Sequence, residues 1–258
     1  MTTRLEMVCA IAREGGRLAL DMRGRLTRSR KADGSVVTNA DVAVQDLLVS
    51  KLRDAFPGVG IIAEENDLVS KEGMPAVFAI DPIDGTDSYQ LGFPHFGVSI
   101  GLIENDRCVL GVFFNPLLDE LFAVDAGEPA TLNGGIIRAE DSLSAPGAPF
   151  LTPSDFHRRF QTDFSGKVRG LGSMAQHLCY VASGQARAAL AYRSHIWDLA
   201  GGLAILSAAG ARVSSFEGEP FHPANHLDGK KIEITLLAAP PKIWKDVHDS
   251  ISPRKDSS

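Results

Sequence analysis

Hydrophobic residues in the first part of the chain recur at the spacing of an α-helix. Apolar and small residues at alternating steps of three and four predict an amphipathic helix over about residues 4–23. The basic stretch 23–31 loses this period, which predicts an exposed loop. Thr38 or Asn39 can cap a second helix, which ends at the proline–glycine pair 57–58. Two helices are therefore expected to open the chain.

Shorter apolar runs follow these helices, and their length predicts β-strands. The expected strands cover residues 60–64, 76–81, 96–104, 107–115 and 120–126. Turn-like residues join the last three runs, which predicts an antiparallel meander. The first half of the chain is thus expected to pack helices on a sheet.

The rest of the chain alternates helix and strand patterns. Helices are predicted over residues 172–184, 197–210 and 242–251, and strands over residues 186–192, 211–216 and 234–239. The tail "SPRKDSS" has the composition of a disordered end. We therefore expect α/β layers, with an N-terminal half over residues 1–138 and a C-terminal half over residues 139–258.

The composition is that of a soluble globular protein, with 44% hydrophobic and 22% charged residues in a chain of 258. The net charge of −6 argues against nucleic acid or an anionic membrane as the main partner. Three cysteines without a C-x-x-C pair predict neither a disulfide framework nor a thiolate zinc site. Because no apolar run resembles a signal peptide or a bilayer-spanning segment, a cytoplasmic location is the default expectation.

Acidic residues stand where apolar segments end or begin. They are Glu64 and Glu65, Asp81 and Asp84, and Asp198. Like charges this close together repel one another unless a cation lies between them, and hard oxygen ligands favour Mg²⁺ over zinc. Taken singly, each acidic group is better explained as part of a solvated turn, a surface pair or a helix cap, and only their order and combination favour a metal site.

The residues around the two aspartates have the features of a phosphate-binding turn. Pro82 fixes its own φ and helps to turn the chain, so that the carbonyl of Ile83 can point inward. Gly85 lets the backbone approach a ligand closely, and the amides of Gly85 and Thr86 can cradle a phosphate at a helix N-terminus. Carboxylates beside an anion cradle suggest phosphoryl transfer.

Six segments occur in a fixed order over roughly 200 residues. They are "VVTNAD" (36–41), "GIIAEEN" (60–66), "AIDPIDGTDSY" (79–89), "FGVSIGL" (96–102), "GSMA" (172–175) and "WDLAGGLAILSAAG" (197–210). In this combination the chain resembles the inositol monophosphatase superfamily of Mg²⁺-dependent, lithium-sensitive phosphatases. The resemblance implies a layered αβαβα sandwich of the inositol monophosphatase and fructose-1,6-bisphosphatase type, and a homodimer.

The resemblance also implies a metal-binding set. Glu64, Asp81 and the backbone oxygen of Ile83 match the ligands of one Mg²⁺ ion. Asp81, Asp84 and Asp198 match those of a second ion, and Glu64 would help to hold a weaker third. Two or three Mg²⁺ ions per active site are therefore expected, with Glu65 the less certain ligand.

Other matched positions carry the reaction. Thr86 and Asp41 match the pair that positions and deprotonates the attacking water, and the phosphate would lie against Asp84, Gly85 and Thr86. The implied reaction is direct attack of a metal-activated water on phosphorus, without a covalent enzyme intermediate. Lys31 matches a loop lysine near the phosphate, although its neighbours are equally well explained by a solvated loop.

Substrate recognition is where the chain departs from the family pattern. Inositol-type members carry an acidic residue seven positions before the aspartate of "WD", whereas this chain has Ala191, followed by Tyr192 and Arg193. Arg193 is a candidate for binding a second anionic group, and a surface salt bridge is the alternative. Ser173 and the backbone of Met174 match positions that face the hydroxyl side of the substrate.

The sequence therefore predicts a Mg²⁺-dependent phosphomonoesterase for a small polyol or sugar phosphate. Fructose-1,6-bisphosphatase and histidinol-phosphatase specificity are the alternatives within the family. Because some relatives regulate transcription or ribosome assembly, an RNA- or polymerase-associated regulatory protein is the alternative from another class. The basic stretch 23–31 would then be the contact, although the acidic net charge makes RNA an unfavourable partner.

Overall fold

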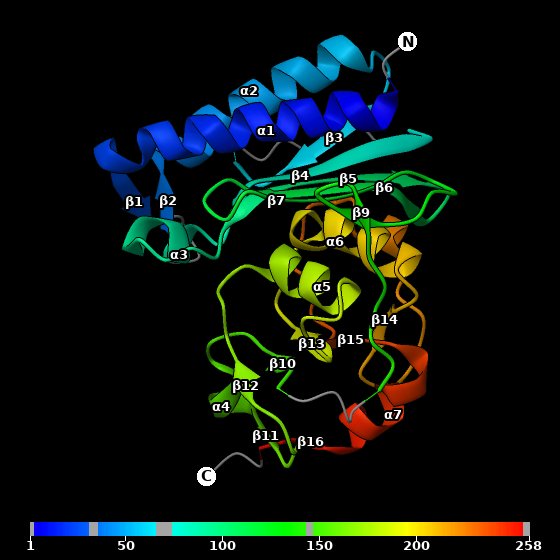
Figure 1. The fold of residues 1–258 in the computed structure, drawn as a ribbon. Helices are drawn as coiled ribbons and strands as arrows, with labels where there is room; N and C mark the ends of the chain where they lie inside the picture. Colours follow the sequence, from blue (N-terminus) through cyan, green and yellow to red (C-terminus); the bar gives the residue numbers. More distant parts are fainter. Residues whose placement is uncertain (1–2, 31–35, 66–73, 143–146, 255–258) are drawn as a thin grey trace.

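The computed structural model describes residues 3–30, 36–65, 74–142 and 147–254 and arranges them in alternating layers of helix and sheet (Figure 1). The helices and 3₁₀ turns are α1 (Arg4–Met22), η1 (Arg23–Arg25), α2 (Asn39–Ala55), α3 (Thr86–Leu91), α4 (Phe156–Arg159), α5 (Met174–Ala182), α6 (Ile196–Ala208), η3 (Pro223–His226) and α7 (Pro241–Asp249).

The larger sheet has seven strands in the order β3-β4-β5-β6-β7-β8-β9 within the described residues. The strands are β3 (Gly60–Ala63), β4 (Ala76–Asp84), β5 (Gly97–Glu104), β6 (Arg107–Asn115), β7 (Glu120–Val124), β8 (Thr131–Leu132) and β9 (Gly135–Ile136). β3 and β4 are parallel, and every later neighbour is antiparallel. The predicted meander is confirmed.

The smaller sheet has the order β12-β10-β13-β15-β14. Its strands are β10 (Phe150–Leu151), β12 (Val168–Arg169), β13 (Ala188–Ala191), β14 (Arg212–Ser215) and β15 (Leu236–Ala239). Two short antiparallel ladders complete the strands, and they join β1 (Arg28–Arg30) to β2 (Val36–Thr38) and β11 (Phe160–Thr162) to β16 (Ile251–Pro253).

The layers follow the predicted αβαβα order (Figure 1). α1 and α2 pack on one face of the larger sheet, α5 and α6 lie between the two sheets, and α7 packs against β15 of the smaller sheet. The apolar stripes read from the sequence face inward, since Val8, Val44, Leu48 and Leu52 are fully buried. Along the described parts of the chain, none of the helices combines the length and apolar character needed to cross a lipid bilayer.

Helix α6 packs backbone to backbone on the larger sheet. A methyl group on Gly111 of β6 would lie 2.2 Å from the carbonyl oxygen of Gly201, and one on Gly101 of β5 would lie 2.5 Å from the carbonyl carbon of Ala200. These positions must therefore be glycine for the helix to come this close. The contact fixes α6, and with it Asp198 in its first turn, relative to the strands.

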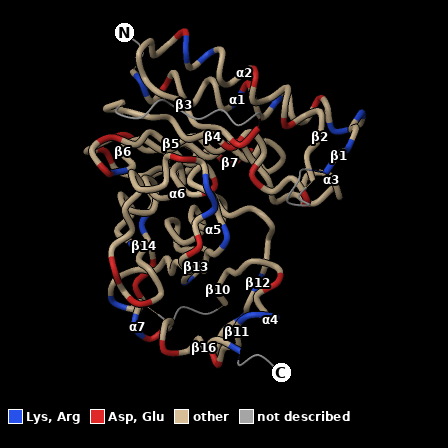
Figure 2. The backbone as a smooth tube through the Cα atoms, turned by 180° about the vertical axis from the view of Figure 1, so that it is seen from behind, with Lys and Arg blue, Asp and Glu red and all other residues tan. Residues whose placement is uncertain are grey.

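Three segments differ from the prediction. Arg28–Arg30 is a strand rather than a loop, because it pairs with β2 (Figure 2, where the β1 segment is blue). Ile251–Pro253 of the tail is also a strand, because it pairs with β11. β4 continues through Asp84 instead of turning at Asp81, with an irregular register against β5 between the two aspartates. The boundary at residues 138–139 stays a prediction, although the chain passes from one sheet to the other between β9 and β10.

Candidate active site

A cavity of about 540 Å³ opens between the end of β4, the N-terminus of α5 and the turn before α6. The predicted site residues that line it are Glu64, Asp81, Ile83, Asp84, Gly85, Thr86, Met174, Arg193 and Asp198. Asp41 and Ser173 are fully buried and lie behind the lining, and Lys31 lies outside the described residues. The structure thus brings together groups that are more than 130 residues apart in sequence (64 to 198).

The end of β4 presents both aspartates to this cavity. Asp81 is paired in register with Ser99 and Asp84 with Gly97, so the two positions between the aspartates bulge out of the ladder. Pro82 lies in the bulge, where its missing N–H removes no ladder hydrogen bond. Because of the bulge, the side chains of both Asp81 and Asp84 line the cavity.

Asp84 is bound by the N-terminus of α5. Its carboxylate accepts hydrogen bonds from the Ser173 hydroxyl at 2.5 Å, the Ala175 N–H at 2.6 Å and the Met174 N–H at 3.1 Å. A carboxylate at a helix N-terminus is stabilised by the unpaired amides there. Ser173, which the sequence matched to a substrate contact, therefore supports Asp84 from behind, and only Met174 of the two reaches the cavity wall.

Thr86 and Asp41 form a hydrogen-bonded pair. The Thr86 hydroxyl lies 3.0 Å from Asp41 Oδ1 and 3.1 Å from the carbonyl oxygen of Ile83, so it can donate to either. The other oxygen of Asp41 accepts from the Thr38 N–H at 2.8 Å and from the Thr38 hydroxyl at 2.5 Å. The capping box of α2 thus holds a buried carboxylate against a hydroxyl that faces the cavity.

Gly85 shapes the turn between β4 and α3. Its φ is +94°, and a side chain there would come within 2.8 Å of the carbonyl oxygen of His95. Gly172, with φ +102°, is equally confined, because a methyl group would lie 2.2 Å from the hydroxyl oxygen of Ser88. Only glycine fits either position, and both line the cavity.

Burial, together with neighbouring negative charge, raises the pKa of Asp81 and of Asp84. Burial is the main cause of the strongly raised pKa of Asp81, and the charges of Glu64, Asp84, Asp198 and Asp41 add to it. Burial also raises the pKa of Asp84 to about 6, although the hydrogen bonds from α5 oppose this rise. Among the described residues, no lysine or arginine forms a salt bridge with either Asp81 or Asp84. Neither of these two carboxylates is therefore paired with a basic side chain in the described part of the chain.

Asp198 and Glu65 have structural contacts as well. Asp198 accepts a hydrogen bond from the His195 N–H at 2.7 Å in the capping box of α6, so it does cap the helix. It also lines the cavity. The backbone of Glu65 is held by Gln45 through hydrogen bonds of 2.5 and 2.7 Å. Glu65 is buried and does not line the cavity, unlike its neighbour Glu64.

The donor set fits Mg²⁺ by its chemistry. It consists of carboxylate oxygens and one backbone carbonyl, which are the ligands of a hard divalent cation. As the described side chains stand, no three His, Cys, Asp or Glu groups already surround one point. Burial is the main cause of the raised pKa values of Asp81 and Asp84, and neighbouring carboxylates add to both, so a bound cation would lower them.

Several lining residues carried no signal in the sequence. His177, Tyr192 and Lys231 come from α5, the end of β13 and the segment before β15, and they meet only in the folded chain. His177 Nε2 accepts the Leu171 N–H at 3.1 Å, which places the ring proton on Nδ1. Burial lowers the pKa of His177 to about 3, so the ring is neutral. Its place in helix 172–184 gave no reason to single it out.

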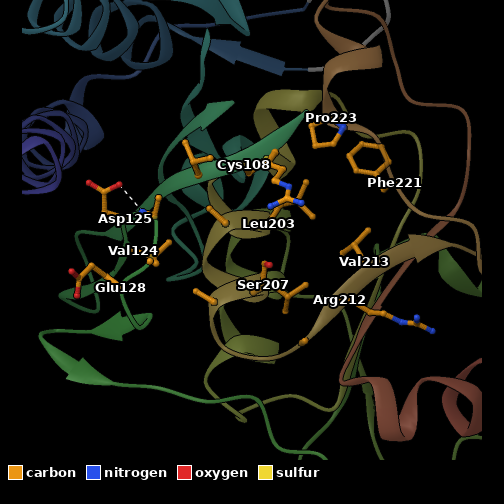
Figure 3. A pocket seen from close by; sticks show the side chains of 18 of the residues that line it. Cys108, Val124, Asp125, Glu128, Leu203, Ser207, Arg212, Val213, Phe221 and Pro223 are labelled. Carbon is orange, nitrogen blue, oxygen red and sulfur yellow. Dashed lines mark hydrogen bonds between the residues drawn. The ribbon is translucent and has the colours of Figure 1, made fainter. Parts of the chain in front are cut away.

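A second cavity, of about 620 Å³, lies at the opposite end of α6 (Figure 3). Cys108, Leu203, Val213 and Phe221 contribute to its wall, with charged residues at the rim. Asp125 is bound by Arg4, and Asp106 is bound by His222 and by the Ala224 N–H. Since these two carboxylates are paired and Glu128 is exposed, the described wall of the second cavity holds no unpaired buried carboxylate like Asp81.

Comparisons with known proteins agree with this geometry. The model of the inositol monophosphatase family matches residues 2–250. The chain is 30% identical to the Nus factor SuhB of Pasteurella multocida over 98% of this chain and 97% of that protein. It is 33% identical to the fructose-1,6-bisphosphatase/inositol-1-monophosphatase of Thermotoga maritima over 84% of this chain and 86% of that one. A solved Thermotoga maritima IMPase superposes with a TM-score of 0.83 at 28% identity and covers 96% of each chain.

Proposed function

The chain belongs to the inositol monophosphatase family, and we propose that it is a Mg²⁺-dependent phosphomonoesterase that hydrolyses a small polyol or sugar phosphate. The observation that carries the proposal is the cavity at the end of β4. There, Asp81 and Asp84 are buried without a salt bridge to any described lysine or arginine, and they stand beside a hydroxyl–carboxylate pair. An anionic phosphate ester would be repelled from such a cavity unless a cation bound with it.

The residues that would hold Mg²⁺ are Glu64, Asp81, the carbonyl group of Ile83, Asp84 and Asp198. When bound, Mg²⁺ would supply positive charge that offsets the carboxylates, acidifies water and stabilises the leaving oxygen. Two or three ions are expected from the family resemblance. α5 and the capping box of α6 hold Asp84 and Asp198 in place before any ion arrives.

Thr86 and Asp41 would orient and deprotonate the attacking water. The water proton moves to Thr86 Oγ1 as the Thr86 proton moves to Asp41 Oδ1, along the existing 3.0 Å contact. Burial raises the pKa of Asp41, against the opposing effect of the bonds from Thr38, which favours proton uptake by this carboxylate. The water oxygen then bonds to phosphorus, the ester P–O bond breaks, and the released alkoxide takes a proton from solvent.

Phosphate would lie against Gly85 and Thr86, beside Asp84. The close approach of the His95 carbonyl oxygen, 2.8 Å from where a side chain of Gly85 would begin, keeps this strip of backbone bare. Bare backbone amides are suited to phosphate oxygens. Lys31 and Met174 are proposed as further contacts, from the matched motif and from the cavity wall respectively.

The proposal is tested by measuring phosphate release from inositol 1-phosphate, fructose 1,6-bisphosphate and histidinol phosphate with malachite green. We expect release with Mg²⁺, loss of release with EDTA and inhibition by lithium. The name of the Thermotoga maritima fructose-1,6-bisphosphatase/inositol-1-monophosphatase supports the first two substrates. Release that survives EDTA in metal-free buffer would contradict the proposed mechanism.

A regulatory role is the second candidate, and one surface feature favours it. Leu91 and Phe93 are exposed by 66% and 57%, and they lie beside the basic stretch because Arg23 donates to the Phe93 carbonyl and Arg28 to the Gln90 carbonyl. Exposed apolar side chains with basic neighbours are typical of a docking surface. Several relatives are named Nus factor SuhB.

The two functions are separated by one variant. A salt-sensitive pull-down of RNA or polymerase that Asp84→Asn leaves unchanged would favour regulation, and loss of phosphatase activity alone would favour the enzyme. A homodimer and a cytoplasmic location are proposed on the grounds of the family resemblance, and size-exclusion chromatography with light scattering tests the first.

A further inference from the structure

An arginine-lined cavity of about 760 Å³ adjoins the candidate active site. Tyr192 and Arg193 line both cavities, so the two spaces share one wall. Arg158, Arg159 and Arg254 also line the second space. The four arginines come from α4, from the turn after β13 and from the chain after β16, which are brought together only by the fold.

Some of these arginines are held in place by neighbouring groups. Asp155 accepts a hydrogen bond from the Tyr192 hydroxyl at 2.6 Å and one from Arg159 Nε at 3.4 Å. The Arg159 guanidinium also lies over the Tyr192 ring, 5.4 Å from its centre. Arg254 Nε donates to the Phe160 carbonyl at 3.4 Å. The wall of the adjoining cavity is therefore built by named contacts.

Arg193 and Arg158 differ, because within the described ranges neither guanidinium forms a salt bridge like that of Arg159 or a hydrogen bond to a carbonyl like that of Arg254. Glu217 and Glu233 line the same space but are paired with neither arginine. The surface salt bridge that the sequence offered as an alternative for Arg193 is thus not formed among the described residues. Two guanidinium groups remain available beside the phosphate site.

The backbone conformation of Arg193 also indicates a functional role for this residue. Its φ of +57° is in the left-handed region, which is costly for a residue other than glycine. The conformation is fixed because the next residue, Ser194, forms a β-bridge with Ile232, and its carbonyl accepts the Ile232 N–H at 2.7 Å. Strain of this kind at the rim of a candidate active site is often retained for function.

We propose that the substrate carries a second anionic group, a phosphate or a carboxylate, which Arg193 and Arg158 bind in the adjoining cavity while the scissile phosphate lies against Gly85 and Thr86. This inference rests on the proposed function and defines its substrate class. A guanidinium binds phosphate and carboxylate alike through paired N–H donors. The phenol of Tyr192 stays neutral, because burial and the bond to Asp155 raise its pKa. The negative charge of Asp155 is itself paired with Arg159.

The test compares three esters on the wild-type protein with Mg²⁺. They are inositol 1-phosphate with one anionic group, fructose 1,6-bisphosphate with two phosphates, and 2-phosphoglycerate with a phosphate and a carboxylate. We expect kcat/KM about 10- to 100-fold higher for at least one ester with two anionic groups, which is the range for hydrogen bonds to a charged group. Preference between the last two esters identifies the second anion.

The variants Arg193→Gln and Arg158→Gln should remove this preference, mainly by raising KM for the ester with two anionic groups. The loss of kcat/KM for inositol 1-phosphate should be smaller. Arg107→Gln, at the far end of α6, is the matched control and should change neither. Equal kcat/KM for all three esters in the wild type, or a preference that survives both variants, overturns the inference.

Failure of the proposed function can be distinguished from failure of this inference. If no ester is hydrolysed, the function is wrong, and titration calorimetry of the same esters decides the inference by itself. If an ester with two anionic groups binds more tightly than inositol 1-phosphate, and Arg193→Gln abolishes the difference, the second-anion site is supported. Equal affinities for the three esters would overturn it.

Discussion

The two ends of helix α6 carry cavities of similar size that differ in the state of their charges. At the N-terminal end, Asp81 and Asp84 are buried with raised pKa values and no basic partner among the described residues. At the C-terminal end, Asp125 has a lowered pKa, because hydrogen bonds from Arg4 and the Ala126 N–H outweigh burial. Asp81 and Asp84 at the N-terminal end therefore lack a described basic partner, whereas Asp125 at the C-terminal end is paired with Arg4.

The difference shows that cavity volume does not identify a site. In the larger space of about 620 Å³ the carboxylates of Asp106 and Asp125 are paired, whereas the space of about 540 Å³ is lined by Glu64, Asp81, Ile83, Asp84 and Asp198. Uncompensated charge costs folding free energy, so it persists where a ligand repays that cost.

The largest effect is expected for Asp81→Asn, which tests whether the carboxylates at the N-terminal end of α6 hold a metal. This change removes a proposed metal ligand, and we expect at least about a 10³-fold loss of kcat, which corresponds to about 4 kcal/mol. The asparagine keeps an acceptor for the Ile83 N–H, which Asp81 Oδ1 now accepts at 3.0 Å. Because a buried repelling charge disappears, the metal-free variant should melt at or above the wild-type temperature.

Asp125→Asn is the matched control at the other end of α6. It should retain activity but lose stability, because it weakens the bidentate contact with Arg4. Phosphate release and melting curves check both variants. Retained activity in Asp81→Asn would remove the metal-site model.

Gly111→Ala addresses the helix that joins the two ends. A methyl group 2.2 Å from the Gly201 carbonyl oxygen has no room, so we expect a loss of about 3 kcal/mol in the free energy of unfolding. Gly24→Ala, where nothing lies within 4 Å, is the control and should change little. Urea unfolding measures both, and a neutral Gly111→Ala would mean that α6 can move away from the sheet.

Thr86→Ala tests the hydroxyl–carboxylate pair. Removal of the hydroxyl that bonds to Asp41 at 3.0 Å should lower kcat about 100-fold, or about 2.7 kcal/mol, with a smaller change in KM. Ser207→Ala, in the wall of the far cavity, should leave kcat unchanged. A Thr86→Ala enzyme with normal kcat would assign the proton transfer to another group.

His177 makes stability depend on pH. Burial holds its pKa at about 3, below the ordinary 6.5, so the unfolded chain takes up a proton that the folded chain refuses. This contribution is complete above pH 6.5 and is lost as pH falls, by about 2 kcal/mol at pH 5. Melting curves of wild type and His177→Gln from pH 7 to pH 5 should therefore converge, and parallel curves would contradict the assignment.

The smallest effect is expected at the exposed pair Asp106–His222. The contact of 2.6 Å lowers the pKa of Asp106, yet both side chains are substantially exposed, at 39% and 56%. We expect His222→Ala to cost less than about 1 kcal/mol and the cost to fall in high salt. A double-mutant cycle with Asp106→Asn measures the interaction free energy of the pair. A large value that does not fall in high salt would contradict the expectation of a weak, solvent-screened contact.

The reaction centre could be anticipated from the sequence because its parts are local. Asp81, Pro82 and Asp84 stand within one short segment, and Thr38 with Asp41 forms a capping box that is readable from its spacing. What could not be read was the bulge that keeps Asp84 in β4, since it depends on pairing with β5.

The recognition side was less predictable because it is assembled from distant segments. Arg158 and Arg193 are 35 positions apart (158 to 193), and Arg254 comes from a tail expected to be disordered. The strand that orders this tail exists only through its pairing with β11. Tertiary pairing of this kind leaves no periodic trace in a single sequence.

The glycine seat of α6 gives the molecule a modular construction. Main-chain atoms, rather than rotatable side chains, set the spacing between this helix and β5 and β6, so Asp198 keeps its alignment whatever rotamers the surrounding core adopts. The turn that carries Arg193 lies outside this seat. Side-chain substitutions at Arg193 that keep the His195–Asp198 hydrogen bond should therefore alter the choice of ester without moving α6.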